Sequence, residues 1–232
     1  MPAPPDLDLS ELERRLRAGL AGDLPGAGAQ LRFAPRPPLR TWDPSARPAG
    51  ARHAAALLLL YPGLRGPSIA LTRRHADLPH HGGQISLPGG GVHPEESVEA
   101  AAAREAHEEI GVDPLSIRML GGLSPLWVAV SGFVVHPVVA VAAARPAWVP
   151  SPREVEAILE VPVAQVCDPA GLAWARRRRG GVDLLVPHFR LAGQQVWGAT
   201  AMILGEFAAV LDPAFGPGPA PAPDAEGLIT LF

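Results

Sequence analysis

The chain has 232 residues, of which 47% are hydrophobic and 19% charged, and its net charge is −3 with a pI near 6.2. This composition is typical of a folded globular protein and excludes a largely disordered chain. The charge balance offers no basic face for nucleic acid and no cationic anchor for a membrane. A single cysteine, Cys167, excludes an internal disulfide and, with no secretory signal, favours a cytoplasmic location.

Two proline-rich segments flank a more regular middle part of the chain. Residues 1–50 are predicted to form an N-terminal extension with one short helix, which a capping box between Ser10 and Glu13 opens. Residues 213–232 form a tail rich in proline, alanine and glycine. The sequence therefore predicts one globular domain over residues 51–212.

The middle part alternates between strand and helix patterns. Aliphatic and β-branched residues between turn signals predict strands at residues 54–61, 69–74, 134–143 and 183–191. Cap residues and composition predict helices at residues 97–110, 152–159 and 199–211, the second of them capped by Ser151. The apolar run at 126–144 is long enough to cross a bilayer, but its valines, glycine and proline favour a turn and a buried strand.

Three glutamates gather on one face of the predicted helix at 97–110. Each helical residue advances by about 100°, so Glu105 and Glu109 lie about 40° apart and Glu108 lies beside them. Like charges at this spacing repel each other, and a divalent cation relieves that repulsion. Because magnesium prefers hard oxygen ligands, the three carboxylates are candidate ligands for it.

The same residues allow a plainer interpretation, a solvated acidic stripe that carries one Arg104–Glu108 ion pair. The glycines just before the helix argue against it. Gly89, Gly90 and Gly91 let a main-chain carbonyl or amide come close to a metal ion or a phosphate. The glycine-rich stretch therefore favours a metal and phosphate site.

Spaced residues across this region resemble the signature of a known family. Gly90 is followed after five residues by Glu96, and after seven more by Arg104-Glu105-Ala106-His107-Glu108-Glu109-Ile110-Gly111-Val112. This pattern resembles the Nudix box of the Nudix hydrolases, with Ala106 at a position where the family has an aliphatic residue. The resemblance implies an α/β/α sandwich around a mixed β-sheet, and hydrolysis of nucleoside diphosphates linked to another group.

The resemblance also implies a role for each residue of the box. The ligands of Mg²⁺ or Mn²⁺ would be Glu105, Glu108, Glu109 and the carbonyl of Gly90. Arg104 would orient the carboxylates, and Glu96 would anchor the loop to the helix. The metal neutralises phosphate charge and lowers the pKa of a bound water, whose proton a carboxylate accepts. We expect Glu105 to be this general base, ahead of Glu154 or Glu156 on a later loop.

A second pattern lies just upstream and comprises Leu71-Thr72-Arg73-Arg74, then Gly83, then Leu87-Pro88-Gly89-Gly90. It resembles the additional signature of Nudix enzymes that act on coenzyme A. The resemblance implies cleavage of coenzyme A to 3′,5′-ADP and 4′-phosphopantetheine, with the substrate bound by Arg74, Arg73, Gly89 and Gly90. Because successive strand residues point to opposite faces, at most one of the two arginines meets the ligand, and we favour Arg74.

Three departures from the second pattern keep other interpretations open. His75 replaces the usual serine or alanine, Pro79 an arginine and Leu87 a phenylalanine; His80, His81 or Arg73 would have to compensate for the missing arginine. ADP-ribose, NADH or an oxidised nucleotide is therefore an alternative substrate, and a non-catalytic nucleotide sensor is an alternative class.

Other residues are expected to be structural. Arg176–Arg179 is predicted to be a solvated hairpin tip rather than a nucleic-acid patch, and Trp197 and Cys167 are expected in the core. The expected partner is a small nucleotide, with no nucleic acid and no membrane. The sequence leaves the oligomeric state open, a homodimer included.

Overall fold

Helices and strands alternate along the chain in a computed structural model that describes residues 8–37, 42–77, 82–179, 181–222, 225 and 229–230. The helices are α1 (Leu9–Leu20), α2 (Gly26–Gln30), α3 (Val98–Ile110), α4 (Val163–Val166) and α5 (Gly198–Leu211), with 3₁₀ turns η1 (Leu31–Phe33), η2 (Pro114–Ser116) and η3 (Pro169–Gly171). The strands are β1 (Arg52–Gly63), β2 (Gly66–Arg74), β3 (Ile85–Ser86), β4 (Gly89–Gly91), β5 (Ile117–Gly122), β6 (Leu126–Val128), β7 (Phe133–Ala142), β8 (Val155–Pro162), β9 (Leu172–Arg179), β10 (Val182–Leu191), β11 (Gln194–Val196) and β12 (Ile229–Thr230).

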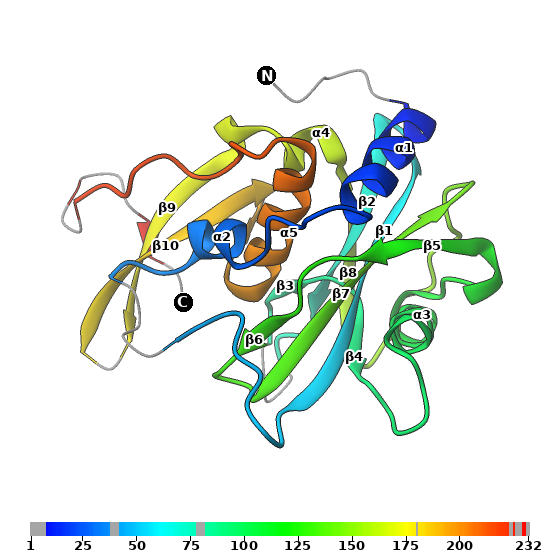
Figure 1. Ribbon diagram of the computed structural model, residues 1–232, viewed down its shortest axis with the longest axis horizontal. Coiled ribbons are helices and arrows are strands. Elements are labelled where there is room, and N and C mark those ends of the chain that lie inside the picture. The colour runs from blue at the N-terminus through cyan, green and yellow to red at the C-terminus, as the bar shows by residue number, and fades with distance from the viewer. Residues whose placement is uncertain are drawn as a thin grey trace.

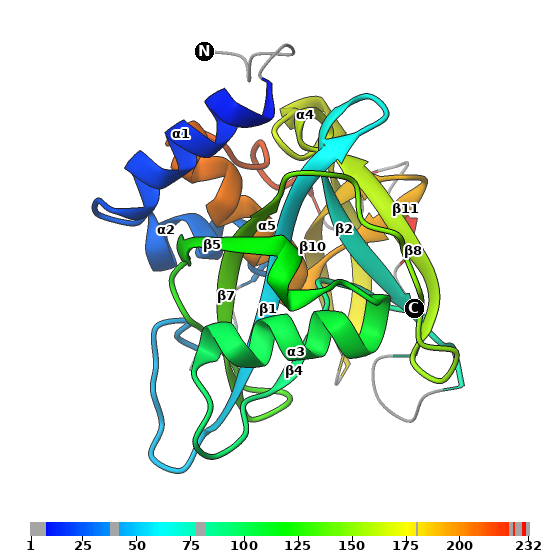
Figure 2. The same cartoon turned by 90° about the vertical axis from the view of Figure 1, so that its right-hand side faces the viewer.

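The strands form two sheets. Within the described residues the larger sheet has eight strands, ordered β3-β2-β1-β7-β5 with β4, β6 and β8 paired beside this path, and the smaller sheet is ordered β11-β10-β9-β12. Helix α3 covers one face of the larger sheet, whereas α1 and α5 lie on the other side (Figure 1, Figure 2). The expected α/β sandwich around a mixed sheet is therefore confirmed. No described helix combines the length and apolar composition that a membrane span requires.

Strand β1 is the centre of the larger sheet. It pairs in parallel with β7 and antiparallel with β2 and β4. Leu57 and Leu59 pack on the α3 side, and Leu58 and Leu60 on the side of α1 and α5, because alternate residues point to opposite faces. Burial on both faces explains why the strand is a continuous apolar run. The strands predicted from sequence are confirmed as β1, β2, β7 and β10.

Helix α3 has clear start and stop residues. The Ser97 side chain accepts a hydrogen bond from the Ala100 amide at 3.1 Å, and Gly111 ends the helix in the left-handed conformation at φ 74°. Small residues on its inner face, among them the fully buried Ala106, let the helix approach the sheet closely. The helices predicted at 97–110 and 199–211 are confirmed as α3 and α5.

The helix predicted at residues 152–159 is wrong, because this segment forms strand β8. The carbonyl of Ser151 accepts hydrogen bonds from the amides of Glu154 and Val155, so Ser151 closes a turn and does not cap a helix. β8 pairs antiparallel with β2 along its length. Pairing with a strand distant in sequence outweighs a local capping signal of about 1 kcal/mol.

Helix α1 begins earlier than the capping box predicted. Its cap is Asp8, whose side chain accepts a hydrogen bond from the Glu11 amide at 2.8 Å, and Ser10 lies inside the helix. Aspartate and serine are about equally good caps. The sequence signal therefore could not discriminate between the two positions.

The described part of residues 1–50 packs into the main core. Leu12, Leu16 and Phe33 are at most 1% exposed and belong to the same apolar cluster as α5 and one face of β1 and β2. The ring of Phe33 stacks on Phe189 of β10, with 4.9 Å between ring centroids. This segment therefore covers one face of the domain and links its two sheets.

A buried carboxylate holds the same segment in place. Glu206 of α5 is 0% exposed and accepts hydrogen bonds from the Gly26 amide at 3.1 Å and the Gln30 side chain at 2.9 Å. It also accepts one from the amide of Ser124 at 3.1 Å. Three donors compensate for the burial of this carboxylate.

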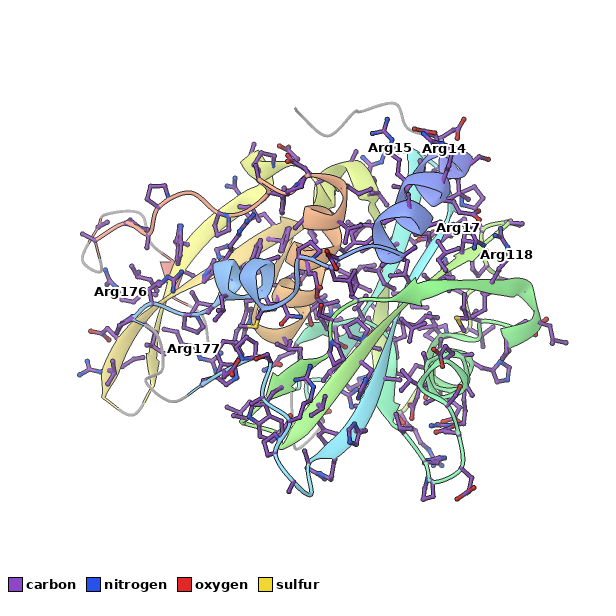
Figure 3. All side chains as sticks on the ribbon, viewed as in Figure 1. Arg14, Arg15, Arg17, Arg118, Arg176 and Arg177 are labelled. Carbon is purple, nitrogen blue, oxygen red and sulfur yellow. The ribbon has the colours of Figure 1, made fainter. Side chains whose placement is uncertain are left out.

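The arginine run ends β9 and belongs to the smaller sheet. Arg177 places its guanidinium 4.1 Å from the ring centroid of Trp197, which packs against a small apolar cluster, whereas Arg178 is exposed. Figure 3 shows Arg176 and Arg177 at the opposite end of the molecule from α3. Beyond them, β12 of the tail pairs in parallel with β9.

His188 of β10 is fully buried in this sheet, on the face that also carries Leu184 and Val186. Burial lowers the pKa of His188 below its ordinary value, and the charge of Arg190 lowers it further. Below an ordinary histidine pKa of about 6.5, this histidine is protonated in the unfolded chain, whereas in the folded chain it is protonated only at a lower pH. The contribution of His188 to stability is therefore lost as the pH falls.

Replacing Phe33 tests whether the N-terminal segment is part of the core. We expect Phe33→Ala to lower the free energy of unfolding by about 3–5 kcal/mol, because it opens a cavity beside Phe189. Leu31→Ala, at a position 39% exposed, is the control and should change it by less than about 0.5 kcal/mol. Urea denaturation measures the free energy of unfolding of both variants. Equally small decreases in the two would contradict the packing of Phe33 in the core.

Replacing His188 tests the pH dependence. As the pH falls from about 7 to about 5, we expect the free energy of unfolding of His188→Leu to rise relative to that of the wild type, because only the wild type carries the buried histidine. His93→Ala, at an exposed position, should follow the wild-type curve. Urea denaturation at a series of pH values gives the slopes, and parallel curves for wild type and His188→Leu would exclude this residue as the cause.

Candidate active site

The three glutamates of α3 differ in exposure. The side chain of Glu109 is 4% exposed, that of Glu105 is 15% exposed and that of Glu108 is 58% exposed. Glu109 therefore lies inside the sandwich, Glu105 lies at its edge, and Glu108 points mostly into solvent. The acidic face extends from the core to the surface.

Glu109 is a buried carboxylate that its surroundings only partly neutralise. It accepts a hydrogen bond from the Gly89 amide at 3.2 Å, and Arg74 Nη1 lies 3.5 Å from its other oxygen. Burial raises the pKa of Glu109 to about 7, and the charges of Glu154 and Glu105 act in the same direction. Gly89 and Arg74 oppose this increase. The site therefore favours a further positive charge near Glu109.

Arg104 joins the acidic helix to the glycine-rich loop. Its guanidinium donates to Glu105 at 2.8 Å, to the carbonyl of Gly91 at 2.9 Å and to Glu96 at 2.8 Å. The bonds from Arg104 to Glu96, together with one from the His93 amide, lower the pKa of Glu96 to about 2. Arg104 Nη1 also lies 3.5 Å from Glu108, so the ion pair of the plainer interpretation is present but longer than the bond to Glu105.

The backbone of β4 lies directly against these carboxylates. A Cβ atom at Gly90 would lie 2.5 Å from the carboxylate oxygens of Glu105. A Cβ atom at Gly89, where φ is 159°, would overlap the backbone of Ala55 and Ala56 in β1. Gly89 therefore has no room for a side chain against β1, and a side chain at Gly90 would displace the Glu105 carboxylate.

The donor set fits magnesium or manganese. Within the described residues, no three His, Cys, Asp or Glu side chains form a cluster that could hold a metal by themselves. Magnesium is commonly bound by one or two carboxylates and completes its shell with water and phosphate oxygens. Glu105 and Glu109 carry carboxylate oxygens, which are hard donors, at a site whose negative charge is only partly compensated. The absence of a side chain at Gly90 lets the Glu105 carboxylate lie directly against the backbone of β4.

The two arginines of β2 have different partners. Arg74 lies beside Glu109, whereas Arg73 forms an ion pair of 3.0 Å with Glu156 of β8. The alternation of side chains along a strand explains the difference. Glu154 is exposed and contributes negative charge at Glu109. Arg74 and Glu154 thus belong to the acidic site, and Arg73 and Glu156 pair with each other.

The structure describes two of the three positions that depart from the second pattern, and they lie in different surroundings. Leu87 is 5% exposed and packs in the main core, so its substitution changes packing. The amide of His75 donates to the carbonyl of Glu154 at 3.1 Å and so joins β2 to the loop before β8. Pro79, His80 and His81 lie outside the described residues.

Sequence reasoning missed two main-chain contacts of the site. The Gly91 carbonyl accepts a hydrogen bond from Arg104, and the Ser151 amide donates to the Glu109 carbonyl at 2.8 Å. Neither contact has a side-chain pattern that could reveal it.

Cys167 is buried, and burial raises the pKa of its thiol to about 12, which suits a structural residue and not a nucleophile.

Comparison with known proteins identifies the family. A protein-family model described as the NUDIX domain matches residues 51–180. An uncharacterized Nudix hydrolase, NudL, of Pectobacterium atrosepticum is 36% identical over 173 residues, which cover 71% of this chain and 86% of the relative. NudL of Photorhabdus laumondii is 33% identical over 175 residues, which cover 75% and 89%. The crystal structure of a Nudix hydrolase from M. smegmatis, RenU, is 31% identical and covers 52% of this chain and 76% of its own, with a TM-score of 0.41. The chain belongs to the Nudix family of hydrolases.

Adding one methyl group at Gly90 tests the close approach of β4 and α3. We expect Gly90→Ala to lower the rate of Mg²⁺-dependent diphosphate hydrolysis by about 100-fold, because it displaces the Glu105 carboxylate. Gly91→Ala is the matched control, since a Cβ atom there meets nothing within 4 Å. Steady-state kinetics compares the two variants after circular dichroism has shown that both fold. Equal losses in both would contradict the geometric explanation.

Proposed function

We propose that the protein hydrolyses the diphosphate linkage of coenzyme A and releases 3′,5′-ADP and 4′-phosphopantetheine. Support comes from the way the two halves of the upstream pattern meet. The Arg74 amide donates to the Gln84 carbonyl, and the Gly83 amide donates to the Arg74 carbonyl, both at 3.1 Å. The second half continues to Gly89, whose amide bonds Glu109. The residues that resemble the coenzyme A signature therefore adjoin the acidic site.

The position of Arg74 is the observation on which the proposal depends most. Its guanidinium lies 3.5 Å from Glu109, and no acceptor among the described residues pairs with its buried Nε. A guanidinium presents planar donors that match phosphate oxygens. A diphosphate bound at the acidic site would satisfy those donors, and Arg74 would bind it.

The residues of the box would divide the work between binding and orientation. When bound, Mg²⁺ or Mn²⁺ neutralises phosphate charge and lowers the pKa of a bound water. Glu105, Glu109 and the Gly90 carbonyl would hold the ion, with Glu108 as the outermost carboxylate of the set. Arg104 would keep Glu105 in position through its bond of 2.8 Å. The chain thus contributes a preorganised anionic site and an opposing arginine.

Glu105 is our candidate for the general base. One of its oxygens accepts a hydrogen bond from Arg104, which leaves the other oxygen to accept a proton from the attacking water. Glu154 is second, because its charge acts on the same site. Glu156 ranks last, since it is ion-paired with Arg73.

ADP-ribose and NADH are the alternative substrates. His75 favours them, because it occupies a position where enzymes of the coenzyme A signature have serine or alanine. Its amide bonds the Glu154 carbonyl, which places this residue next to the site. The chemistry at the diphosphate would be the same for each substrate, so only the recognised groups differ.

Incubation with a panel of substrates tests the proposal. Purified protein with saturating Mg²⁺ should convert coenzyme A to 4′-phosphopantetheine and 3′,5′-ADP with a higher kcat/KM than ADP-ribose or NADH. Chromatography with mass detection identifies the products, and EDTA should abolish the reaction. A higher kcat/KM for ADP-ribose or NADH would contradict coenzyme A as the substrate. It would still agree with hydrolysis of a diphosphate linkage at this site.

Glu109→Gln is the control that assigns turnover to this site. It keeps the size of the side chain and should lower kcat by about 100-fold or more, because a charged oxygen ligand is lost. An unchanged melting temperature would show that the fold persists. Nucleotide binding by the wild type without any turnover would instead support the sensor.

A further inference from the structure

Two histidines from neighbouring strands meet outside the acidic site. His53 of β1 and His136 of β7 lie with Nδ1 of the first 2.8 Å from Nε2 of the second. Their ring centroids are 5.1 Å apart and their planes are tilted by 33°. The two strands run in parallel, with Ala55 opposite His136, so the pair is held by the central ladder of the sheet.

The pair lies on the face of the sheet that α3 covers. Ala55 and Leu57 of β1 and Val138 of β7 pack on that side, and alternation places His53 and His136 there too. Figure 2 shows α3 lying across these strands. His53 is exposed and His136 is half-buried, so the pair is accessible from solvent.

The geometry brings two imidazole nitrogens to one point. At 2.8 Å, one nitrogen donates its hydrogen and the other accepts it. When the donor ring takes its other tautomer, with the hydrogen on the far ring nitrogen, two lone pairs face a common position and both rings stay neutral. A tetrahedral zinc ion with Zn–N distances of about 2.0–2.1 Å needs its nitrogens about 3.3 Å apart. An increase of about 0.5 Å in the distance between the two nitrogens would admit the ion. The ring of His53 is exposed and is free to make that movement.

The charges around the pair are balanced. Burial lowers the pKa of His136, and His53 and Arg47 lower it further, whereas Glu99 on the first turn of α3 raises it. Arg47 is held by the carbonyls of Pro44, Ala46 and Pro125, and Glu99 supplies the compensating negative charge.

We propose that His53 and His136 form a second metal site, for a borderline divalent ion such as Zn²⁺ or Ni²⁺. Imidazole suits these ions, whereas carboxylates and carbonyls suit magnesium and manganese, so the two sites would select different metals. In the part of the chain that the structure describes, no third His, Cys, Asp or Glu completes a cluster with them, so water fills the remaining positions.

Ion binding would stabilise the base of the glycine-rich strand. The carbonyl of His53 accepts a hydrogen bond from the Val92 amide at 3.0 Å, directly after β4. An ion that links β1 to β7 here would restrain that junction without touching Glu105 or Glu109. We therefore expect Zn²⁺ to raise the melting temperature and not to replace Mg²⁺ in turnover.

Calorimetric titration of the full chain tests the site. Metal-depleted protein in excess Mg²⁺, which occupies the carboxylates, should bind one Zn²⁺ per chain with a Kd in the micromolar range. His53→Ala and His136→Ala should each weaken binding at least tenfold, and His93→Ala, an exposed histidine beside Glu96, should not. Lowering the pH from neutral to mildly acidic should also weaken binding, because protons compete for the same nitrogens.

The fold of each variant is checked through its Mg²⁺-dependent turnover, which should match the wild type because neither histidine belongs to the acidic site. His53→Gln and His136→Gln serve if an alanine variant is unstable. Absence of Zn²⁺ binding up to millimolar concentration, or equal affinity in the wild type and both variants of the pair, would overturn the proposal. Loss of binding in His93→Ala alone would place the ion elsewhere and would also overturn it.

Discussion

The hydrogen bond from the Gly89 amide to the buried carboxylate of Glu109 is the contact on which the site depends. It joins β4 to α3 at a point where the backbone of β1 leaves no room for a side chain at Gly89. Burial raises the pKa of this carboxylate to about 7, and a nearby positive charge favours its ionised form. The packing of the sandwich itself therefore creates an affinity for positive charge.

Two arginines lie at the two ends of the acidic face and have different partners. Arg104 uses its donors on Glu96, Glu105 and the Gly91 carbonyl, and so makes the loop and helix one rigid unit. Arg74 lies at the other end, 3.5 Å from Glu109, with a donor that no described residue accepts. One guanidinium thus serves structure, and the other keeps one donor that no described residue accepts, which is the division that our proposed diphosphate site calls for.

The same central strand adjoins both proposed sites. On the edge that pairs with β4 it supports carboxylates and main-chain oxygens, and on the edge that pairs with β7 it presents His53 to His136. The N-terminal segment covers the opposite face, where Phe33 and Glu206 bind it to α5 and the smaller sheet. The sheet therefore separates the chemistry from the packing that stabilises it.

Local patterns in the sequence were sufficient to predict α3 between Ser97 and Gly111, the buried strands, and the set of acidic and glycine residues in the box. These features depend on residues within a few positions of each other, where periodicity and capping act. Tertiary structure alone decided that β8 is a strand, that Arg74 pairs with Glu109 and Arg73 with Glu156, and that residues 9–34 join the core. It also brought His53 to His136, 83 positions away. Each of these outcomes depends on pairing or burial between distant segments, and no short-range signal encodes such contacts.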